Sequence, residues 1–449
     1  MTLIQDLRRI AALAGPVLVG QLAVIAFSVI DTIMAGRASA TDLAAVGLGG
    51  SIYVTVYISL MGVLQALAPI AGQLYGAGRH AEIGVEVRQA AWLGLALAVP
   101  GMLLLSFPGP LLAFAKAPPE LVDKATAYLH LQAFGLPAAL GFRIYSALNN
   151  ALSRPIMVTL LQLLGLAVKV PLNAWFIHGG LGLAPMGGPG CALASTLISW
   201  MWCLSGALIL RHGGAYRPLG IFAAWSWPMR SHLWALLRLG VPMGLTYLIE
   251  ITSFTLMSVF ITRLGTVTLA GHQIIANLGA VAYMLPLSLG IATSTLVAQA
   301  VGARDRAGAR RVGWRGIRLA AALALAVGAT LWLLRAPVLR AYASDAAVVQ
   351  AALPLVTFVA LYQAFDAVQV TTAFVLRAYK IALVPTAIYA VSLWGIGLGG
   401  GYVLGFGLID GMPAFTHGAA GFWLANSLSL AIAGALLVFY FIRISEERS

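Results

Sequence analysis

The sequence predicts an all-α membrane protein with twelve transmembrane helices, arranged as two pseudo-symmetric six-helix lobes around a central cleft. Three observations support this fold class. Of the 449 residues, 61% are hydrophobic and only 9% are charged. Apolar stretches of ~20 residues, the length of a membrane-spanning helix, recur along the whole chain. The two halves of the chain also match each other at a constant offset, as duplicated membrane bundles do.

The spans lie on the apolar stretches, at roughly 35 residues for each helix with its loop. They are expected at residues 10–35, 44–72, 91–115, 122–149, 155–178, 189–211, 234–262, 267–299, 317–339, 349–376, 382–408 and 417–442. A cleavable signal is not expected, because Asp6 and the pair Arg8 and Arg9 precede the first apolar stretch and no small-residue cleavage pattern follows it.

The basic residues predict the orientation of the spans, because cytoplasmic connections carry most of the Lys and Arg. If the chain starts inside the cell, 17 basic residues fall in inner connections and six in outer ones. Arg143 and Lys169 lie within spans and belong to neither group. The prediction is a multi-pass protein of the cell inner membrane with both termini in the cytoplasm. The net charge of +13 forms no patch with interleaved aromatics, which argues against nucleic-acid binding.

An internal repeat is visible at an offset of 226 residues. This offset aligns Pro16 with Pro242 and, without a gap, Arg37 with Arg263, Tyr57 with Tyr283 and Gln73 with Gln299. The longest polar break, 211–232, separates an amino-terminal lobe, 1–210, from a carboxyl-terminal lobe and short tail, 233–449. Because each half holds six spans, the repeats share one orientation and pair about an axis along the membrane normal, with a cleft between them. The break itself is expected to be a cytoplasmic connection.

Three lone carboxylates, Asp31, Glu250 and Asp366, each lie inside a long apolar run. A charged side chain in hydrocarbon costs ~3 kcal/mol on insertion scales, so it normally faces a bundle interior or water and marks a transport pathway. Enzymatic signatures are missing from the sequence: there is no HExxH, P-loop, G-x-S-x-G or CxxC. His272, beside Gln273, is expected to be a packed polar residue rather than a metal ligand. The chain is therefore not expected to be an enzyme.

Asp31 admits two interpretations. It could be an aspartate at the outer end of a helix, since Gly36 and Arg37 follow soon after. Against this, only Ser28 interrupts the apolar run that precedes it. The favoured interpretation is a buried coupling carboxylate.

The residues around Asp31 are expected to come from the fifth and sixth spans. Asn173 and Ser195 lie at a comparable outer depth and add hard oxygen atoms, which suit Na⁺ or a proton-linked network. Lys169 lies one turn before Asn173, where it either neutralises Asp31 or extends its ammonium toward the membrane surface.

A second site is predicted around Glu250 and Asp366. Tyr362 precedes Asp366 by four residues and shares its helix face. Together these three side chains supply two charges and a hydroxyl, which with water is enough to hold Na⁺. The alternative is a structural polar network without a bound ion. Asp31, being a single carboxylate, is better suited to accept a proton and to act as a switch, with Pro16 as the bend in the first helix.

Four segments resemble the multidrug and toxic compound extrusion (MATE) transporters, in particular the NorM-like branch: "IDTIMAGRASATDLAAVGLGGSIY", "GQLYGAGR", "LAGHQIIANLGAVAYMLPLSLGIAT" and "AQAVGA". The resemblance covers essentially the whole chain. It implies export of small cationic or amphiphilic drugs across the lipid bilayer in exchange for Na⁺ or H⁺, with no cofactor. We expect a monomer.

The resemblance also assigns residues. It implies that Asp31 and Pro16 match the acidic residue and bend proline of the first helix, and that Asn173 and Ser195 match the Asn and Thr of an amino-lobe ion site. It further matches Glu250, Tyr362 and Asp366 to a carboxyl-lobe cation site, Gln273 and Tyr283 to the substrate cleft, and Asp345 to an outer-loop acid beside that cleft. Ile177 replaces a second aspartate of some members, which weakens the case for a complete amino-lobe Na⁺ site.

Two other functions fit the sequence less well. A flippase for lipid-linked precursors of related fold would need a cationic cavity for pyrophosphate, whereas the predicted cleft is acidic. An intramembrane transferase or protease would need a convergent catalytic set, and Glu250 and Asp366 have no accompanying nucleophile. A drug antiporter is therefore the preferred function, and ion-driven drug uptake into everted vesicles would discriminate between them.

Overall fold

The computed structural model describes residues 2–114, 118–180, 182–409, 411–413 and 416–447. Over this part of the chain the regular structure is helical, and eleven helices are long and apolar enough to cross a membrane. A further helix, α6 (Pro119–Ala151), is 33 residues long but less apolar. With α6 included, the predicted all-α membrane fold of twelve spans is confirmed.

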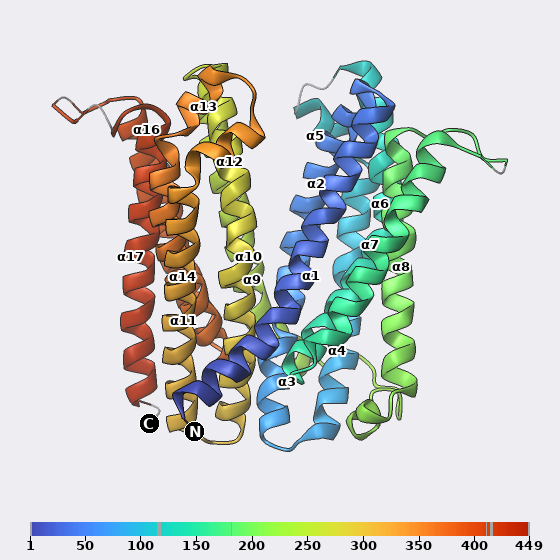
Figure 1. The fold of residues 1–449 in the computed structure, drawn as a ribbon. Coiled ribbons are helices and arrows are strands. Elements are labelled where there is room, and N and C mark those ends of the chain that lie inside the picture. Colours follow the sequence, from blue (N-terminus) through green and yellow to red (C-terminus); the bar gives the residue numbers. More distant parts are fainter. Residues whose placement is uncertain (1, 115–117, 181, 410, 414–415, 448–449) are drawn as a thin grey trace. The chain divides into compact units, whose positions relative to one another are not determined.

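Tertiary contacts group the chain into two compact units, drawn in Figure 1 with colours that follow the sequence. The amino-terminal unit is Val19–Gly244, and the carboxyl-terminal unit is Leu245–Ser449 together with Met1–Leu18. The helix α1 (Leu3–Ala38) and the helix α9 (Arg230–Thr262) therefore each belong partly to both units. The two division points, after Leu18 and after Gly244, are separated by the same 226 residues as the sequence repeat.

The amino-terminal unit is built around α6. Its other elements are the last part of α1, α2 (Ala40–Leu64), α3 (Leu67–Gly76), α4 (His80–Ser106), α5 (Gly109–Phe114), α7 (Pro155–His178), α8 (Gly188–His212), the 3₁₀ turn η1 (Gly214–Leu219) and the first part of α9. Because α6 packs against α2, α3, α4, α7 and α8, it faces protein rather than lipid. It buries polar groups such as Asn149, which accepts a 2.6 Å hydrogen bond from Tyr216 Oη. This location explains its lower hydropathy.

The carboxyl-terminal unit has its core among four long helices. Its elements are the first part of α1, most of α9, α10 (Thr266–Gly302), α11 (Arg306–Leu333), α12 (Arg335–Tyr342), α13 (Ala346–Ala352), α14 (Leu355–Ala378), α15 (Leu383–Ala390), the π-helical segment η2 (Val391–Gly399), α16 (Gly400–Gly405) and α17 (Gly418–Glu447). The central helix α14 packs against α10, α11 and α17. Figure 1 shows both ends of the described chain at one end of this unit, and α12 and α13 at the other end.

The first part of α1 packs in the core of the carboxyl-terminal unit. Ile10 and Ala14 are buried in a cluster with residues of α10, α11, α14 and α17. Asp6 is buried and forms ion pairs with Arg311, at 3.3 Å, and with Arg315. Pro16, the predicted bend, lies inside α1 two residues before the division point, and Pro242 occupies the equivalent place in α9.

Residues 211–232, predicted as a connection between lobes, pack onto α4 within the amino-terminal unit. Arg88 donates hydrogen bonds to the carbonyls of Gly220, at 2.8 Å, and Ile221, at 3.0 Å. Glu86 lies 2.7 Å from His232 Nδ1. Gly84 is required at the contact, because a Cβ there would collide with the carbonyl oxygen of Leu219. Through these contacts, the polar residues in the first turns of α4 are bound by the 211–232 segment rather than by water.

Several predicted helix boundaries were wrong, because helices extend beyond their apolar parts where polar residues have protein partners. The span predicted at 91–115 ends at Ser106 and begins at His80, because the polar residues of its first turns bind the 211–232 segment. The span predicted at 317–339 begins at Arg306, since α11 extends beyond its apolar part. The span predicted at 382–408 consists of α15, η2 and α16, with a π-helical centre.

Candidate functional site

Asp31 is held in a buried ion pair with Lys169. The Lys169 ammonium lies 2.8 Å from Asp31 Oδ1 and 3.0 Å from Oδ2. Asn173 Nδ2 donates a hydrogen bond of 2.7 Å to the same carboxylate. Asp31 is 7% exposed, whereas Lys169 and Asn173 are completely buried. Lys169 therefore neutralises Asp31 and does not extend to the membrane surface, which decides between the two roles that the sequence left open.

The remaining contacts of Lys169 complete its coordination. Its ammonium donates to Ser195 Oγ and, at 3.4 Å, to the carbonyl of Cys191. It also lies 5.4 Å from the centre of the Phe27 ring, which adds a cation–π contact. Because an ammonium has three N–H donors, Asp31, Ser195 and Cys191 satisfy all of them. The predicted grouping of Asp31 with the fifth and sixth spans is present, with a lysine at its centre.

The local geometry of α7 produces this pair. Lys169 and Asn173 are four residues apart, so both side chains leave the same face of the helix. Pro171 lies between them inside α7 and removes one backbone hydrogen bond from this stretch. On α8, Ser195 Oγ also donates to the carbonyl of Cys191, at 2.9 Å, which orients the hydroxyl oxygen toward the ammonium. Residues of α1, α7 and α8 thus meet around one buried ion pair.

The second group, in the carboxyl-terminal unit, contains Glu250 on α9 and Asp366 with Tyr362 on α14. Asp366 is 2% exposed and Tyr362 6%, while Glu250 is half-buried. The two carboxylates interact electrostatically with each other. Among the described residues, Asp366 Oδ2 is a buried oxygen with no hydrogen-bond partner. A buried acceptor beside a second acid is an arrangement that favours a bound cation or a proton.

Aromatic residues surround this carboxyl-terminal group. The Tyr362 ring meets Trp423 edge-on at 5.6 Å and Phe254 at 6.2 Å. Tyr283 and Tyr389 interact electrostatically with both carboxylates. Tyr283, which was predicted to line the substrate cleft, is thus close enough to the acids to interact with them, and Tyr389 is an addition that the sequence did not single out. Phenol hydroxyls provide further oxygen atoms next to the acids.

Arg377 is a functional candidate that sequence reasoning missed. It was assigned to an inner connection, but it lies in the last turn of α14 and is 5% exposed. Its guanidinium lies over the rings of Phe374, at 4.6 Å, and Tyr247, at 5.7 Å, and it interacts electrostatically with Glu250. The sequence does contain a feature that could have identified it. Arg377 follows Asp366 by 11 residues on one helix, which is about three turns and places both on the same helix face.

Two other predicted site residues, Gln273 and Asp345, are exposed. Gln273 is exposed on α10, ten residues before Tyr283 and therefore ~15 Å from it along the helix axis. Asp345 is exposed and caps α13, where its Oδ1 accepts a 2.8 Å hydrogen bond from the backbone N–H of Ala347. The structure gives Asp345 a local role as a helix cap, and the place of both residues in a substrate cleft stays a prediction.

His272 is hydrogen-bonded through both ring nitrogens. Trp423 Nε1, which only donates, lies 3.2 Å from Nδ1, and Ser258 Oγ lies 3.0 Å from Nε2. Nδ1 must therefore be the acceptor, and a neutral ring carries its proton on Nε2. The imidazole is completely buried. Both nitrogens are engaged, in agreement with the packed polar role expected from the sequence.

These features define a class: a multi-pass helical membrane protein built from two repeats, each with a buried acidic group. The MatE family model matches residues 16–175 and 242–403, two segments that start 226 residues apart. The chain therefore belongs to the MATE family, in its NorM-like branch. The matched segments coincide with the repeat seen in the sequence.

Relatives match along nearly the whole chain. A probable multidrug resistance protein NorM of Aromatoleum aromaticum is 42% identical, over 94% of this chain and 91% of its own length. The multidrug resistance protein PmpM of Pseudomonas aeruginosa is 36% identical, over 96% and 90%. The multidrug resistance protein MdtK of Pectobacterium atrosepticum is 34% identical, over 96% and 94%.

Solved structures share the fold at low sequence identity. The eukaryotic MATE transporter AtDTX14 superposes with a TM-score of 0.88 at 18% identity, over 99% of each chain. The Vibrio cholerae MATE transporter VcmN, in a form described as bent, also gives 0.88, at 16% identity, over 99% of this chain and 98% of its own.

Proposed function

We propose that this protein is a secondary active multidrug efflux transporter of the inner membrane, which exports cationic or amphiphilic drugs in exchange for Na⁺ or H⁺ by alternating access. The observation that carries the proposal is the carboxyl-terminal group, where a buried Asp366 oxygen without a hydrogen-bond partner lies near Glu250 and Tyr362. The names of the relatives support multidrug substrates. Acidic groups inside the membrane favour positively charged cargo.

In this proposal, Glu250, Asp366 and Tyr362 hold the coupling cation. Their oxygens supply two negative charges and one hydroxyl, and water completes the coordination of Na⁺. A proton bound by either acid would neutralise the same charge. Ion binding drives transport only if one conformation binds the ion more tightly, because equal affinity for both conformations shifts no equilibrium. Drug and ion then compete for this negative charge.

Asp31 is proposed as a second, proton-linked switch. It can act only when the Lys169 ammonium leaves its carboxylate. The pair is already neutral, so a proton or drug cation that binds Asp31 must displace the Lys169 ammonium. A buried ammonium left without its partner is strongly unfavourable. Protonation of Asp31 is therefore linked to movement or deprotonation of Lys169. We infer that protonation of Asp31, together with this change at Lys169, changes the bend of α1 at Pro16.

The first prediction tests coupling and charge selectivity in proteoliposomes. We expect efflux of a cationic dye to stop when the coupling gradient is dissipated, with Na⁺ and H⁺ gradients collapsed separately to identify the ion. A monoanionic dye of matched size should move much more slowly, because the acidic groups repel it and aromatic residues add ~1–2 kcal/mol of cation–π attraction only for cations. Equal rates for the two dyes, or efflux that survives both treatments, would contradict the proposal.

The second prediction concerns topology. We expect a cysteine placed at the exposed Arg217 to react with an impermeant thiol reagent only from the inside, because this orientation assigns 17 basic residues to the predicted inner connections and six to the outer ones. The native residues Cys191 and Cys203 are first replaced by Ser. A cysteine at Arg340 is the control and should react from the outside of intact cells. Labelling at position 217 from the outside would reverse the assignment.

A further inference from the structure

An exposed aromatic surface lies on the 211–232 segment, outside both acidic groups. Phe222 is 56% exposed, Trp225 73% and Trp227 72%. The indoles of Trp225 and Trp227 meet edge-on, with their ring centres 6.1 Å apart. Trp92 of α4 stacks on Trp227 at 6.3 Å and meets Trp225 edge-on at 5.6 Å. These three tryptophans form one group, here called the tryptophan cluster, and two of them lie at the protein surface.

The backbone beneath this surface is hydrogen-bonded to side chains of α4. Trp92 Nε1 donates to the carbonyl of Ser226, at 3.0 Å, and Gln89 Nε2 donates to that of Trp227, at 2.9 Å. The backbone N–H of Met229 donates to Gln89 Oε1, at 2.7 Å. Residues 225–229 form neither helix nor strand, and an irregular backbone tolerates membrane depth only where its polar groups have partners. These side chains of α4 provide such partners.

The exposed face of α4 changes in character along the helix. With spacings of three or four residues, this face carries in order Arg88, Trp92, Leu95, Val99 and Leu103. Its three aliphatic members are 56%, 58% and 56% exposed. An order from charged through aromatic to aliphatic is typical of a helix that passes from the membrane–water interface into the hydrocarbon. The tryptophan cluster therefore lies where the lipid-facing part of α4 begins.

That lipid-facing part is short by itself. Residues 90–106 contain no charged or amide side chain and span ~25 Å at 1.5 Å per residue, whereas the hydrocarbon core of a bilayer is ~30 Å thick. The preceding turn carries Glu86, Arg88 and Gln89, and all three bind the 211–232 segment. At this level the outer surface is aromatic instead of charged. The segment thus extends the apolar surface of α4 toward the thickness of the bilayer.

We propose that this aromatic surface contacts the bilayer, with Phe222, Trp225 and Trp227 inserted among the lipids beside α4. An indole combines a large apolar body with one N–H donor, which suits the boundary between acyl chains and headgroups. The contact is apolar, so it requires no anionic headgroup. The connection between the two repeats is then fixed to the lipid surface as well as to α4.

The test measures the depth of a nitroxide spin label at Ala224, an exposed residue beside Trp225. The full-length protein carries C191S, C203S and A224C and is reconstituted in phosphatidylcholine vesicles. Electron paramagnetic resonance then compares the collisions of the label with oxygen, which concentrates in hydrocarbon, and with a water-soluble nickel chelate. L103C, on the lipid-facing stretch of α4, gives the reference value for lipid.

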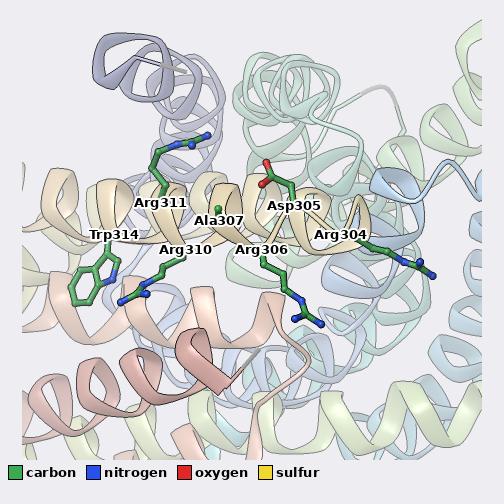
Figure 2. A pocket seen from close by; sticks show the side chains of 7 residues that line it. All are labelled: Arg304, Asp305, Arg306, Ala307, Arg310, Arg311 and Trp314. Atoms are coloured by element: carbon green, nitrogen blue, oxygen red, sulfur yellow. The ribbon is translucent and has the colours of Figure 1, made fainter. Parts of the chain in front are cut away.

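A307C gives the matched reference value for water, since it also replaces an exposed alanine. Figure 2 shows Ala307 at the start of α11, in a groove of about 650 Å³ whose walls carry Arg304, Arg306, Arg310 and Arg311. We expect the oxygen-to-nickel collision ratio at position 224 to be severalfold higher than at 307 and closer to that at 103. A ratio at 224 equal to that at 307 would overturn the proposal and leave the aromatic surface to a protein partner.

Three variants of the A224C protein assign the contact to the indoles. W225S/W227S should lower the ratio at position 224 toward the water value. W234S should not, although Trp234 on α9 is 65% exposed. R88Q weakens the attachment to α4 but keeps the indoles, so it should change the ratio much less. Thermal unfolding should show that all variants are folded.

Two results from these variants would contradict the proposal. An unchanged ratio in W225S/W227S would mean that the indoles do not hold the segment in the lipid. An equal loss in R88Q and in W225S/W227S would mean that attachment to α4 alone sets the depth of the segment.

Discussion

Replacing Asp31 by Asn should destabilise the protein by about 3–5 kcal/mol, because it leaves the Lys169 ammonium buried without a counter-charge. Lys169 is completely buried, and its other acceptors, Ser195 and the Cys191 carbonyl, are neutral. The change is measured as the loss in free energy of unfolding of the purified protein in detergent. A matched control is D345N, which alters an exposed helix cap and should cost ~1 kcal/mol or less.

The double variant D31N/K169M separates stability from transport. Removing both charges of a buried pair is often neutral or stabilising, by ~1–4 kcal/mol, so this variant should recover most of the lost stability. It should nevertheless fail to couple efflux to the gradient if Asp31 is the proton-linked switch. Wild-type transport by D31N/K169M would show that the pair is only structural. Wild-type stability of D31N alone would show that Lys169 is not charged in the folded protein.

The second large effect is expected for Asp366→Asn, which should weaken Na⁺ binding at least tenfold and abolish gradient-driven efflux. The substitution removes one of the two negative charges of the carboxyl-terminal group, and a tenfold loss corresponds to only ~1.4 kcal/mol. Trp423, in ring contact with Tyr362 at 5.6 Å, is a suitable fluorescent reporter of ion binding. Na⁺ titrations of its emission should therefore shift to higher concentration in the variant.

Two further variants sharpen this experiment. Tyr362→Phe removes a hydroxyl but no charge, so its effect on Na⁺ affinity should be smaller than that of Asp366→Asn. D31N/K169M should bind Na⁺ normally, because its pair lies in the other unit. Normal Na⁺ binding by Asp366→Asn would remove the carboxyl-terminal group from the coupling mechanism. Loss of Na⁺ binding in D31N/K169M would end the proposed division of roles between the two units.

The sequence predicted the twelve spans because lipid-facing helices must be apolar along their length. The predicted limits and internal breaks of helices were less accurate where helices pack against protein rather than lipid. The polar start of α4 was read as a loop since nothing local shows that the 211–232 segment covers it. The division of α2 and α3 near Gln65 and the π-helical centre at η2 also depend on packing between helices rather than on composition.

The candidate sites were predicted in part for a similar reason. A carboxylate in an apolar run is visible in a sequence, so Asp31, Glu250 and Asp366 could be found. The partner of a buried charge is not visible, because Lys169 is 138 residues from Asp31 along the chain and either orientation of its long side chain is compatible with its position. Arg377 was misplaced because an arginine near a helix end usually faces water.

The packing of α1 has a consequence for the order in which the protein is made. Asp6 is synthesised 305 residues before Arg311, one of its two ion-pair partners. At ~5–20 residues per second, that interval is about 15–60 s. Membrane insertion of α1 and its final packing are therefore separate events in time. The first part of α1 therefore makes its contacts with α11, α14 and α17 only after those helices of the second repeat have been synthesised.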